Sequence, residues 1–338
     1  MILPTAPHPN PLPRGEGEGC PSPRTMISQT RTSFVIDLPE PELPPEIARY
    51  AAEPPQLGVG KPGKVGEVRM ELAPSGGATR IVRCFHRVPL QVLRALYLDP
   101  LRPDMAFIYV ASPTGGILQG DRLSIEVTAR PGSKAHITTQ AMTKVYRMEH
   151  GYAVQRVHLR TEAGSYLEYL PDPTIPFRHA RYHQQIVLER APGSTLIAAD
   201  ILLPGRVAHG EAFAYDAVSL VVRGQGPDGK LLFRDAMLLE PGRRSPRSPG
   251  LLGPYSVVGS LFVLSENTAV PALVDALASA STTDGDTVIG ATALPNDCGA
   301  MMRVLSRTSA GAQAALRAAW ATARHLYLGD EMPDLRKY

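Results

Sequence analysis

Three segments of this chain repeat one pattern, in which an alternating strand, a glycine turn and a second alternating strand follow one another. The segments read IEVTARPGSKAHITT, VHLRTEAGSYLEYL and IVLERAPGSTLIAA, and their turn glycines are Gly132, Gly164 and Gly193. Glycine supplies the positive φ that a tight bend requires, and strict alternation is typical of strands with one buried face. A chain built in this way is constrained to a mainly β fold.

The spacing of the repeat narrows the architecture further. The turns recur at intervals of about 30 residues, and a looser fourth copy, VVRGQGPDGKLLFRDAML, turns at Asp228 and Gly229. Two strands per unit at this period predict a helical or sandwich-like array of strand pairs. A set of ordinary hairpins in one antiparallel sandwich would produce the same pattern, so this alternative stays open.

Two helices are expected near the C-terminus. Residues 267–280 have Asn267 or Thr268 as a cap, a proline in the first turn and apolar residues at helical spacing. Residues 310–330 place an apolar stripe along one face and end at Gly329, a typical residue after the end of a helix. The predicted fold is therefore a mainly β array of strand pairs with two C-terminal α-helices.

The N-terminal segment differs from the rest of the chain in composition. Residues 1–55 are rich in proline and glycine and show no hydrophobic period and no signal-peptide core. This composition predicts disorder, and Met26 is a candidate for the true start. We therefore expect a disordered segment over 1–55 and a single β-rich domain over 56–338, with a loop at 240–254 where no period is found.

Charge and cysteine content exclude several classes of protein. The formal net charge is +3 over 338 residues, which is too small to predict a nucleic-acid or membrane partner. Cys20, Cys84 and Cys298 are too few and too widely separated for a disulfide framework or a CxxC metal site. No run of about 18 apolar residues occurs. We therefore expect a cytoplasmic protein.

The glycine-rich stretch SPTGGILQGDRL, residues 112–123, raises the question of a nucleotide site. A phosphate-binding loop needs a following helix and a terminal GK[ST], but this stretch runs into an alternating strand and lacks that ending. The nucleotide interpretation therefore fails. A bend explains Gly115, Gly116 and Gly120, and Asp121 is placed to cap its own turn.

Two histidines stand at the spacing of a helical zinc pair. His179 and His183 are four residues apart, but no glutamate follows the first of them and the segment continues into a strand. A solvated polar face explains them better than a metal site does. The sequence also lacks the GxSxG and SxxK nucleophile motifs, so no reaction class is supported, and these residues alone leave an enzyme as an open alternative.

Five carboxylates lie at strand ends or beside turns in otherwise apolar surroundings, where acidic residues are usually exposed turn groups. They are Asp121, Glu168, Asp172, Asp200 and Glu211. If several of them converged in one passage, they would form a path of hard oxygen donors that binds a divalent cation transiently. That chemistry suits metal transfer better than metal storage.

The order of short motifs along residues 64–338 resembles that of the UreD/UreH family of urease accessory proteins. The motifs are SPTGGILQGDRL, TTQAMTKVYR, YLEYLPDPTIPF, LPGRVAHGEAF and the tail LRKY. The positions that match the family motifs are Gly115, Gly116, Gly120, Asp121, Thr139, Lys144, Tyr146, Glu168, Leu170, Pro171, Arg206, Gly210 and Glu211. Thr114 and Gln119 stand where the family usually has glycine.

The resemblance implies a mostly β, helical array that serves as a non-enzymatic scaffold for nickel delivery. Such a protein is expected to dock on apo-urease, to recruit the accessory protein UreF and the GTPase UreG, and to pass nickel through an internal channel. The resemblance implies Ni(II) in transit and no permanently bound cofactor, and it makes the five carboxylates candidates for the nickel path. The competing hypothesis is a metal-dependent hydrolase that uses these carboxylates with His179 or His183.

Overall fold

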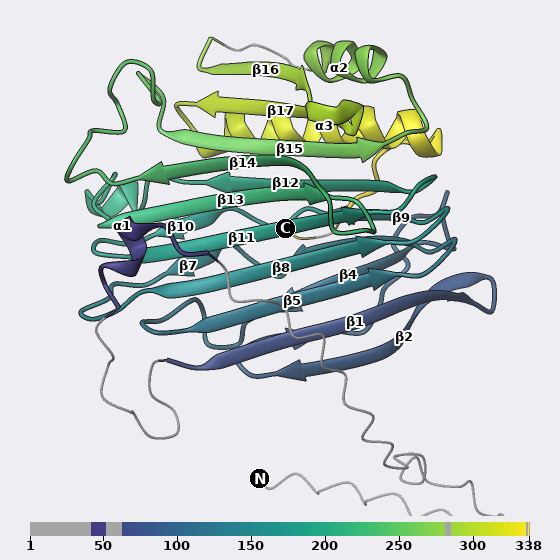
Figure 1. Cartoon of the computed structure of the whole chain (residues 1–338), viewed down its shortest axis with the longest axis horizontal. Helices are drawn as coiled ribbons and strands as arrows, with labels where there is room; N and C mark the ends of the chain where they lie inside the picture. The colour runs from purple at the N-terminus through teal and green to yellow at the C-terminus, as the bar shows by residue number, and fades with distance from the viewer. Residues whose placement is uncertain (1–41, 52–62, 281–284, 336, 338) are drawn as a thin grey trace, which may run out of the picture. The chain divides into compact units, whose positions relative to one another are not determined.

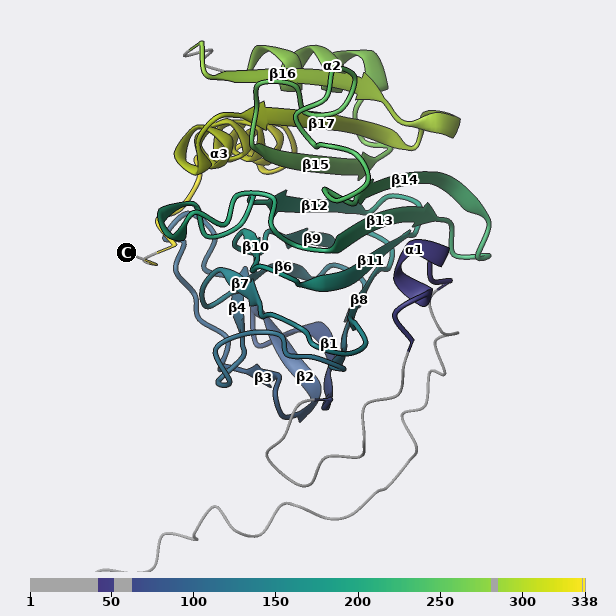
Figure 2. The ribbon, with the colours of Figure 1, turned by 90° about the vertical axis from the view of Figure 1, so that its left-hand side faces the viewer.

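The structure is a computed structural model that describes residues 42–51, 63–280, 285–335 and 337. These residues all belong to one compact unit, Pro41–Tyr338. They form two β-sheets that face each other, with helices on the outer side of one sheet (Figure 1, Figure 2). No helix within these ranges is both long and apolar enough to cross a membrane.

One sheet, sheet A, has seven strands. In spatial order they are β14 (Leu231–Leu239), β13 (Ala217–Gln225), β11 (Arg181–Arg190), β8 (Ala153–Thr161), β5 (Arg122–Ala129), β1 (Val65–Ser75) and β2 (Ala78–Arg87). From β13 to β1 every neighbouring pair is parallel, whereas β14 and β2 pair antiparallel at the two edges.

The other sheet, sheet B, has ten strands. Along its main path they are β16 (Thr287–Ala293), β17 (Gly299–Ser306), β15 (Val257–Ser265), β12 (Thr195–Leu202), β9 (Tyr166–Tyr169), β6 (Lys134–Thr139), β4 (Ala106–Ala111) and β3 (Gln91–Val92), while β10 (Thr174–Pro176) and β7 (Thr143–Val145) lie off this path. The strands from β12 to β4 are parallel to one another.

The chain alternates between the sheets as it advances, since β5, β8 and β11 lie in sheet A while β6, β9 and β12 lie in sheet B. Each strand pairs with its equivalent in the next coil: Ser124 of β5 lies opposite Arg156 of β8, and Ala135 of β6 lies opposite Leu167 of β9. This is the winding of a β-helix. The helical form of the predicted array is thus confirmed, and the alternative of hairpins in an antiparallel sandwich is wrong for the three repeats.

The three repeat glycines carry the chain from one sheet to the other. Gly132, Gly164 and Gly193 have φ values of +72°, +67° and +71°, a region that residues with a Cβ rarely adopt. Their turns lie together at one end of the coils, on the right of Figure 1, which we call the short-turn end. The fourth copy differs, because Gly229 closes a true antiparallel hairpin between β13 and β14 within sheet A.

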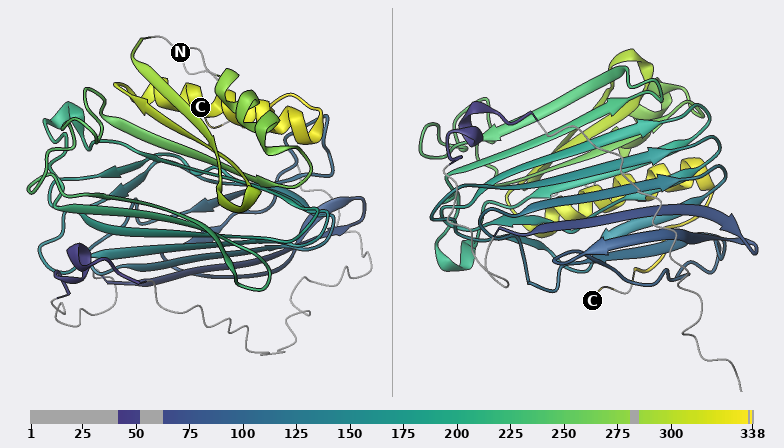
Figure 3. Two further views of the ribbon diagram at one scale, coloured as in Figure 1. Left: turned by 45° about the horizontal axis from the view of Figure 1, so that its top comes forward. Right: turned by 60° about the horizontal axis from the view of Figure 1, so that its bottom comes forward.

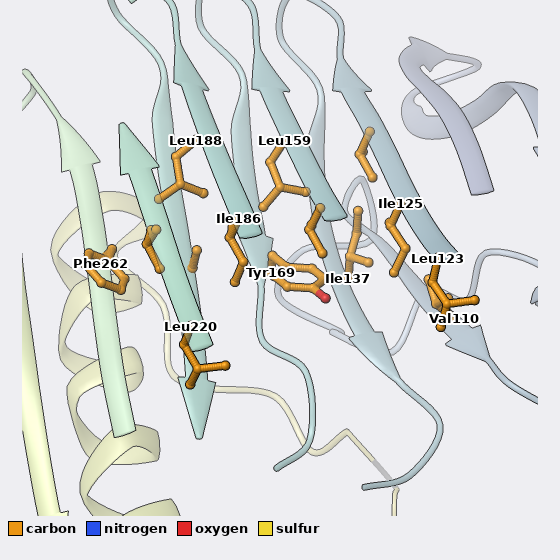
Figure 4. Packing of buried hydrophobic residues seen from close by; sticks show 14 of the residues in the cluster. Val110, Leu123, Ile125, Ile137, Leu159, Tyr169, Ile186, Leu188, Leu220 and Phe262 are labelled. Carbon is orange, nitrogen blue, oxygen red and sulfur yellow. The ribbon is translucent and has the colours of Figure 1, made fainter. Parts of the chain in front are cut away.

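The main core fills the space between the two sheets (Figure 4). On β5, Leu123, Ile125 and Val127 face inward, as the alternation of this strand predicts. Parallel coils stack such inward residues in rows, so that Ile137 of β6 and Leu188 of β11 join the same buried cluster. Removal of this apolar surface from water supplies most of the driving force for the fold.

A second core lies on the outer face of sheet B, under helices α2 (Val270–Ser279) and α3 (Ser309–Leu328). Figure 3 shows both helices on the side of sheet B that is turned away from sheet A. Leu273 and Leu316 pack there against Leu261 of β15. The outer faces of the sheets are therefore unequal, because the helices cover one of them.

Both predicted C-terminal helices are confirmed, with one difference at a cap. Helix α3 begins where the Thr308 side chain accepts a hydrogen bond from the Gly311 N–H, and it ends at Gly329 with φ +74°. Helix α2 starts one residue after Ala269, whose side chain cannot cap it, so neither Asn267 nor Thr268 is the cap residue. The remaining expected loop, between β14 and β15, is also present.

A short helix, α1 (Pro45–Ala48), lies inside the range predicted to be disordered. Its Ile47 is fully buried against Tyr152, Val154 and Ala217, so this stretch packs on the outer face of sheet A. Met26 and the other residues of 1–55 outside 42–51 lie outside the described residues. The predicted division of the chain at residue 55 therefore stays a prediction.

Candidate functional site

The connections opposite the short-turn end are long, and they lie together on the left of Figure 1. They comprise residues 112–121, 146–152, 177–180, 203–216 and 240–256, and we call this the long-loop end. The four internal sequence motifs lie in these connections or run into them. Coiling thus gathers segments that are far apart in sequence onto one end of the unit, where a rigid scaffold commonly places binding residues.

The glycine-rich turn is fastened to the next motif by its backbone. The Ile117 N–H donates to the Lys144 carbonyl at 2.7 Å, and the Tyr146 N–H donates to the Ile117 carbonyl at 2.9 Å. A Cβ on Gly116 would lie 2.4 Å from that Lys144 oxygen, so only glycine permits the approach. Gly115 instead needs its freedom for a φ of +80°. The two neighbouring glycines are therefore required for different reasons.

Asp121 is buried at the end of this turn, with a 1% exposed surface. One of its carboxylate oxygens accepts from the Lys64 N–H at 3.0 Å, and the other accepts from the Leu118 N–H at 2.8 Å. Burial raises the pKa of Asp121, and the backbone hydrogen bonds oppose that shift. Both oxygens are thus engaged in holding the turn against the start of β1. Its role in a metal path stays a prediction.

Gln119 stands where the resemblance leads us to expect glycine, and it links two connections of the long-loop end. Its Oε1 accepts hydrogen bonds from the Glu149 and His150 N–H groups at 2.8 and 2.9 Å. A glycine could make neither bond, so the departure from the family pattern adds a link between two connections of the long-loop end.

The GR…GE motif forms a clasp within the connection from β12 to β13. Arg206 binds both carboxylate oxygens of Glu211, at 2.8 and 2.6 Å, and the hydrogen bonds from Arg206 are the largest cause that lowers the pKa of Glu211 to about 2. The Arg178 N–H donates to the same carboxylate at 3.3 Å. Gly205 has φ +126°, and a Cβ there would lie 2.2 Å from the Glu211 carbonyl oxygen. Gly210 bends the clasp at φ +68°.

Asp172 fastens the C-terminal tail to the strand that carries Thr139. The Lys337 Nζ lies 2.9 Å from the Asp172 carboxylate and also donates to Thr138 Oγ1 at 2.6 Å. The Asp172 N–H donates to Thr139 Oγ1 at 2.9 Å. Burial lowers the pKa of Lys337, and the ion pair with Asp172 opposes this shift. The tail motif and the motif around Pro171 are therefore parts of one contact.

Glu168 lies fully buried beneath α3, on the helix side of sheet B. It contacts His136 Nδ1 at 2.7 Å, the Tyr166 hydroxyl at 2.6 Å and the Arg324 guanidinium at 3.2 Å. Burial opposes ionisation of Glu168, but these partners outweigh it and keep the pKa below its usual range. Arg324 also pairs with the buried Asp99. Glu168 thus anchors the helix and does not face the space between the sheets.

Asp200 is the one carboxylate of the predicted five that faces the space between the sheets. On β12 it points to the same face as Ala198 and Leu202, each two residues away, and both of these belong to the core between the sheets. Burial raises the pKa of Asp200 to about 6, although Arg303 and a hydrogen bond from Ser260 oppose the shift. An ionisable oxygen donor is therefore held inside an otherwise apolar core.

Other polar side chains extend from Asp200 in both directions along the axis of the coils. This interior polar row consists of Gln155, Tyr182, Gln184, Asp200, Ser260, Arg303 and Asp235. The Tyr182 hydroxyl lies 2.7 Å from Gln155 Oε1 and 3.0 Å from Gln184 Oε1. At the far end Arg303 binds Ser260 at 2.8 Å and Asp235 at 2.7 Å, and this ion pair is about 30% exposed.

A cavity of about 470 Å³ connects the row to the long-loop end. Gly115, Gly116, Thr139 and Lys144 contribute to its lining, together with Gln155 from the row. Four family-motif positions therefore share this cavity with Gln155, the one residue of the interior polar row that lines it. Of the row, only Asp200 was predicted as a site residue; the signal that was missed is a polar side chain at an inward position of an alternating strand.

The remaining predicted carboxylates do not converge with Asp200, since each has its own partners. Among the residues that the structure describes, no group of three or more His, Cys, Asp or Glu side chains is arranged to hold a metal ion. His179 contacts Asp216 at 3.0 Å, and His183 is buried against Ser219 at 3.1 Å. Burial lowers the pKa of His183 to about 4. The two histidines contact neither each other nor the five carboxylates in the described structure.

Comparison with known proteins gives a consistent result over most of the chain. The family model described as UreD urease accessory protein matches residues 64–337. A protein of Streptomyces griseus named urease accessory protein UreD 2 is 42% identical over 86% of this chain and 100% of its own length. Proteins named urease accessory protein UreD from Haloarcula marismortui and Photorhabdus laumondii are 41% and 35% identical, over 87% and 86% of this chain and 98% and 91% of their own lengths. These relatives are named as accessory proteins and not as enzymes.

Proposed function

Because this chain belongs to the UreD family of urease accessory proteins and so has a role in urease maturation, we propose that it is a non-catalytic scaffold for nickel delivery. In this proposal it binds apo-urease, UreF and UreG in the cytoplasm, and Ni(II) is its cargo and not a resident cofactor. The observation that carries the proposal is the cavity in which family-motif residues lie beside Gln155, the residue at which the interior polar row begins.

The interior polar row supplies the ligand chemistry that a passing cation needs. Amide, hydroxyl and carboxylate oxygens bind divalent cations without the permanence of thiolates. The row has two carboxylates, Asp200 and Asp235, of which Asp235 is paired with Arg303. At neutral pH the Asp200 carboxyl, with a pKa near 6, is mostly ionised. A cation that enters at Gln155 would therefore meet neutral oxygens first and the charged oxygen of Asp200 next. We propose this row as the nickel path.

The contacts of the other four carboxylates support different roles. Asp121 and Glu211 hold connections of the long-loop end in place, while Glu168 and Asp172 fix α3 and the C-terminal tail. A ligand role for these four would require each to leave a bond seen in the structure. Asp200 is accordingly the first residue to test. No observation favours the hydrolase hypothesis.

The test is Asp200→Asn in a chain produced together with urease and the other accessory proteins. We expect the complexes with apo-urease, UreF and UreG to form as in wild type, and nickel per urease and urease activity to fall several-fold. The matched control is Glu189→Gln, the same carboxylate-to-amide change on a residue that is equally buried but contacts His158 and Arg160 on the outer face of sheet A.

Each result has a distinct meaning. Unchanged nickel content in Asp200→Asn would contradict the proposed path, whereas a wild-type chain that binds none of the urease proteins would contradict the scaffold itself. An equal loss of nickel content and urease activity in Glu189→Gln would show that the effect arises from impaired folding. Nickel content and complex formation must therefore be measured on the same preparations.

A further inference from the structure

We propose that the long-loop end is a docking surface for a protein whose own surface carries carboxylates. The proposal rests on the scaffold function proposed above and adds the chemistry of the surface that the scaffold uses. It is carried by the exposed charges of the five connections at this end.

The exposed charges at the long-loop end are almost all positive. Among the five connections, which the structure describes completely, the exposed arginines are Arg147, Arg178, Arg243, Arg244 and Arg247. Glu149 is the one exposed carboxylate in the same connections. The exposed groups of these connections are therefore mostly positive, although the formal net charge of the whole chain is only +3.

The other carboxylates at this end are already neutralised by neighbours. Glu211 is bound by Arg206, Asp216 by Arg181, and Glu240 by Arg49. By contrast, Arg147 and Arg244 have no ion pair within the described part of the chain. These two guanidiniums remain free to bind carboxylates from outside, and they do so with the bidentate geometry that makes arginine common in interfaces.

The arginines belong to one surface, because their connections contact one another. The Met148 N–H donates to the His179 carbonyl at 3.2 Å, which joins 146–152 to 177–180. The Arg247 guanidinium lies 5.6 Å from the centre of the Phe213 ring, which joins 240–256 to 203–216. The surface therefore spans several coils and is not the tip of a single loop.

The surface includes an exposed apolar side chain and has a fixed shape. Val207, next to Arg206, is 62% exposed, and apolar residues within a charged rim are typical of protein interfaces. The Arg206 guanidinium lies 4.2 Å from the centre of the Phe177 ring, and the Glu211 clasp closes the same connection. Loops held in this way lose little freedom on binding, which favours affinity.

The test is the double variant Arg147→Glu, Arg244→Glu, with apo-urease, UreF and UreG mixed with it one at a time. We expect binding of at least one of these proteins to weaken about tenfold or more, and wild-type binding to that protein to weaken as salt is raised. The control is Lys230→Glu, Arg234→Glu, which changes the net charge equally but lies on the β13–β14 hairpin. Thermal unfolding of both variants should match wild type, because the exposed side chains that are replaced form no ion pairs within the described residues.

Four results would decide the matter differently. Suppose that raised salt does not weaken binding by the wild-type chain and that the Arg147→Glu, Arg244→Glu variant binds as tightly as wild type. That result would overturn the docking surface and leave the scaffold proposal intact. Equal weakening by both double variants would also overturn it, since the effect would follow net charge. The wild-type chain could also bind a single-stranded RNA. If the Arg147→Glu, Arg244→Glu variant alone loses that binding while protein binding is unchanged, the surface is assigned to nucleic acid. A wild-type chain that binds none of the three proteins would instead remove the proposed function.

Discussion

At the scale of single residues, carboxyl groups in this protein occupy two contrasting environments. Glu211 binds an arginine at the surface, whereas Asp200 lies in the core with its pKa raised to about 6 by burial. A carboxyl that stays ionised in such a place costs stability, because its charged form is poorly solvated there. Residues that are kept at such a cost are good candidates for function.

Asp200→Asn is therefore expected to stabilise the fold at pH 7.5. The folded state holds the pKa near 6, whereas an unfolded aspartate has about 3.9. The folded chain binds more protons between these values, so stability falls as pH rises through them. Asparagine does not titrate, so Asp200→Asn does not lose folding stability in this way. In wild type the loss reaches about 3 kcal/mol above pH 6. Melting temperatures should be higher than wild type at pH 7.5 and converge near pH 4; a variant that melts lower at pH 7.5 would contradict this account.

Residue patterns alone explain why Asp200 was predicted and its neighbours in the row were not. An aspartate within IAADILL stands out against apolar residues. Gln155 and Gln184 do not, because polar residues occupy every second position of their strands, and periodicity cannot tell which face is inward when both faces contain polar groups. The partners of Asp200 on β14, β15 and β17 come from later coils, and their proximity depends on the register of the fold.

At the scale of elements, α3 is held in place by a cluster of charged side chains that cannot be predicted from the sequence of the helix. Its apolar stripe and its end at Gly329 were predictable from spacing. Arg324 lies within that stripe and is fully buried between Asp99 and Glu168. The partners are distant in sequence, so only the fold brings them together.

Arg324→Met should cost about 3–5 kcal/mol of folding stability, because it leaves Asp99 and Glu168 as buried carboxylates without their guanidinium. The control is Arg317→Met, an exposed position on the same helix, where the change should stay within about 0.5 kcal/mol. Urea unfolding of both variants at pH 7.5 measures the difference. Equal stability of the two variants would show that the buried cluster does not hold the helix.

In the repeats too, the features set by neighbouring residues could be predicted from the sequence, whereas those set by distant strands could not. Their strands and glycine turns were predictable because alternation and positive φ are local properties. Whether consecutive strands pair as hairpins or wind between two sheets depends on partners one coil away. Gly193 and Gly229 occur in similar turns, yet one turn crosses between sheets and the other closes the β13–β14 hairpin.

At the scale of the whole molecule, the two ends of the folded unit differ in construction and in expected role. The short-turn end repeats compact glycine turns, while the long-loop end collects the family motifs and the exposed arginines. The C-terminal tail adds a further long-range link, since Leu335 accepts a hydrogen bond from the Tyr109 hydroxyl at 2.6 Å and Lys337 pairs with Asp172. Local changes at the tail should therefore affect the sheet.

A chain that ends at Asp330 should be less stable than the full chain by about 2–5 kcal/mol, the sum expected for one partly buried ion pair and the three hydrogen bonds that involve Glu331, Leu335 and Lys337. Thermal unfolding of the truncated chain measures the loss. Lys337→Met in the full chain removes the ion pair with Asp172 and the hydrogen bond to Thr138, and should reproduce part of the loss. A truncated chain that melts with the full chain would show that the tail contacts contribute nothing to stability.

The winding of parallel coils also sets a length scale for transport. Neighbouring strands of a sheet lie about 4.8 Å apart, so β14 lies three strand spacings, or about 14 Å, from β8 along sheet A. A divalent cation binds oxygen at about 2.0–2.6 Å, which is close to half a strand spacing. If the interior polar row carries a cation as proposed, an ion between two coils would contact the next oxygen donor before it leaves the previous one, and it would move in short steps from donor to donor.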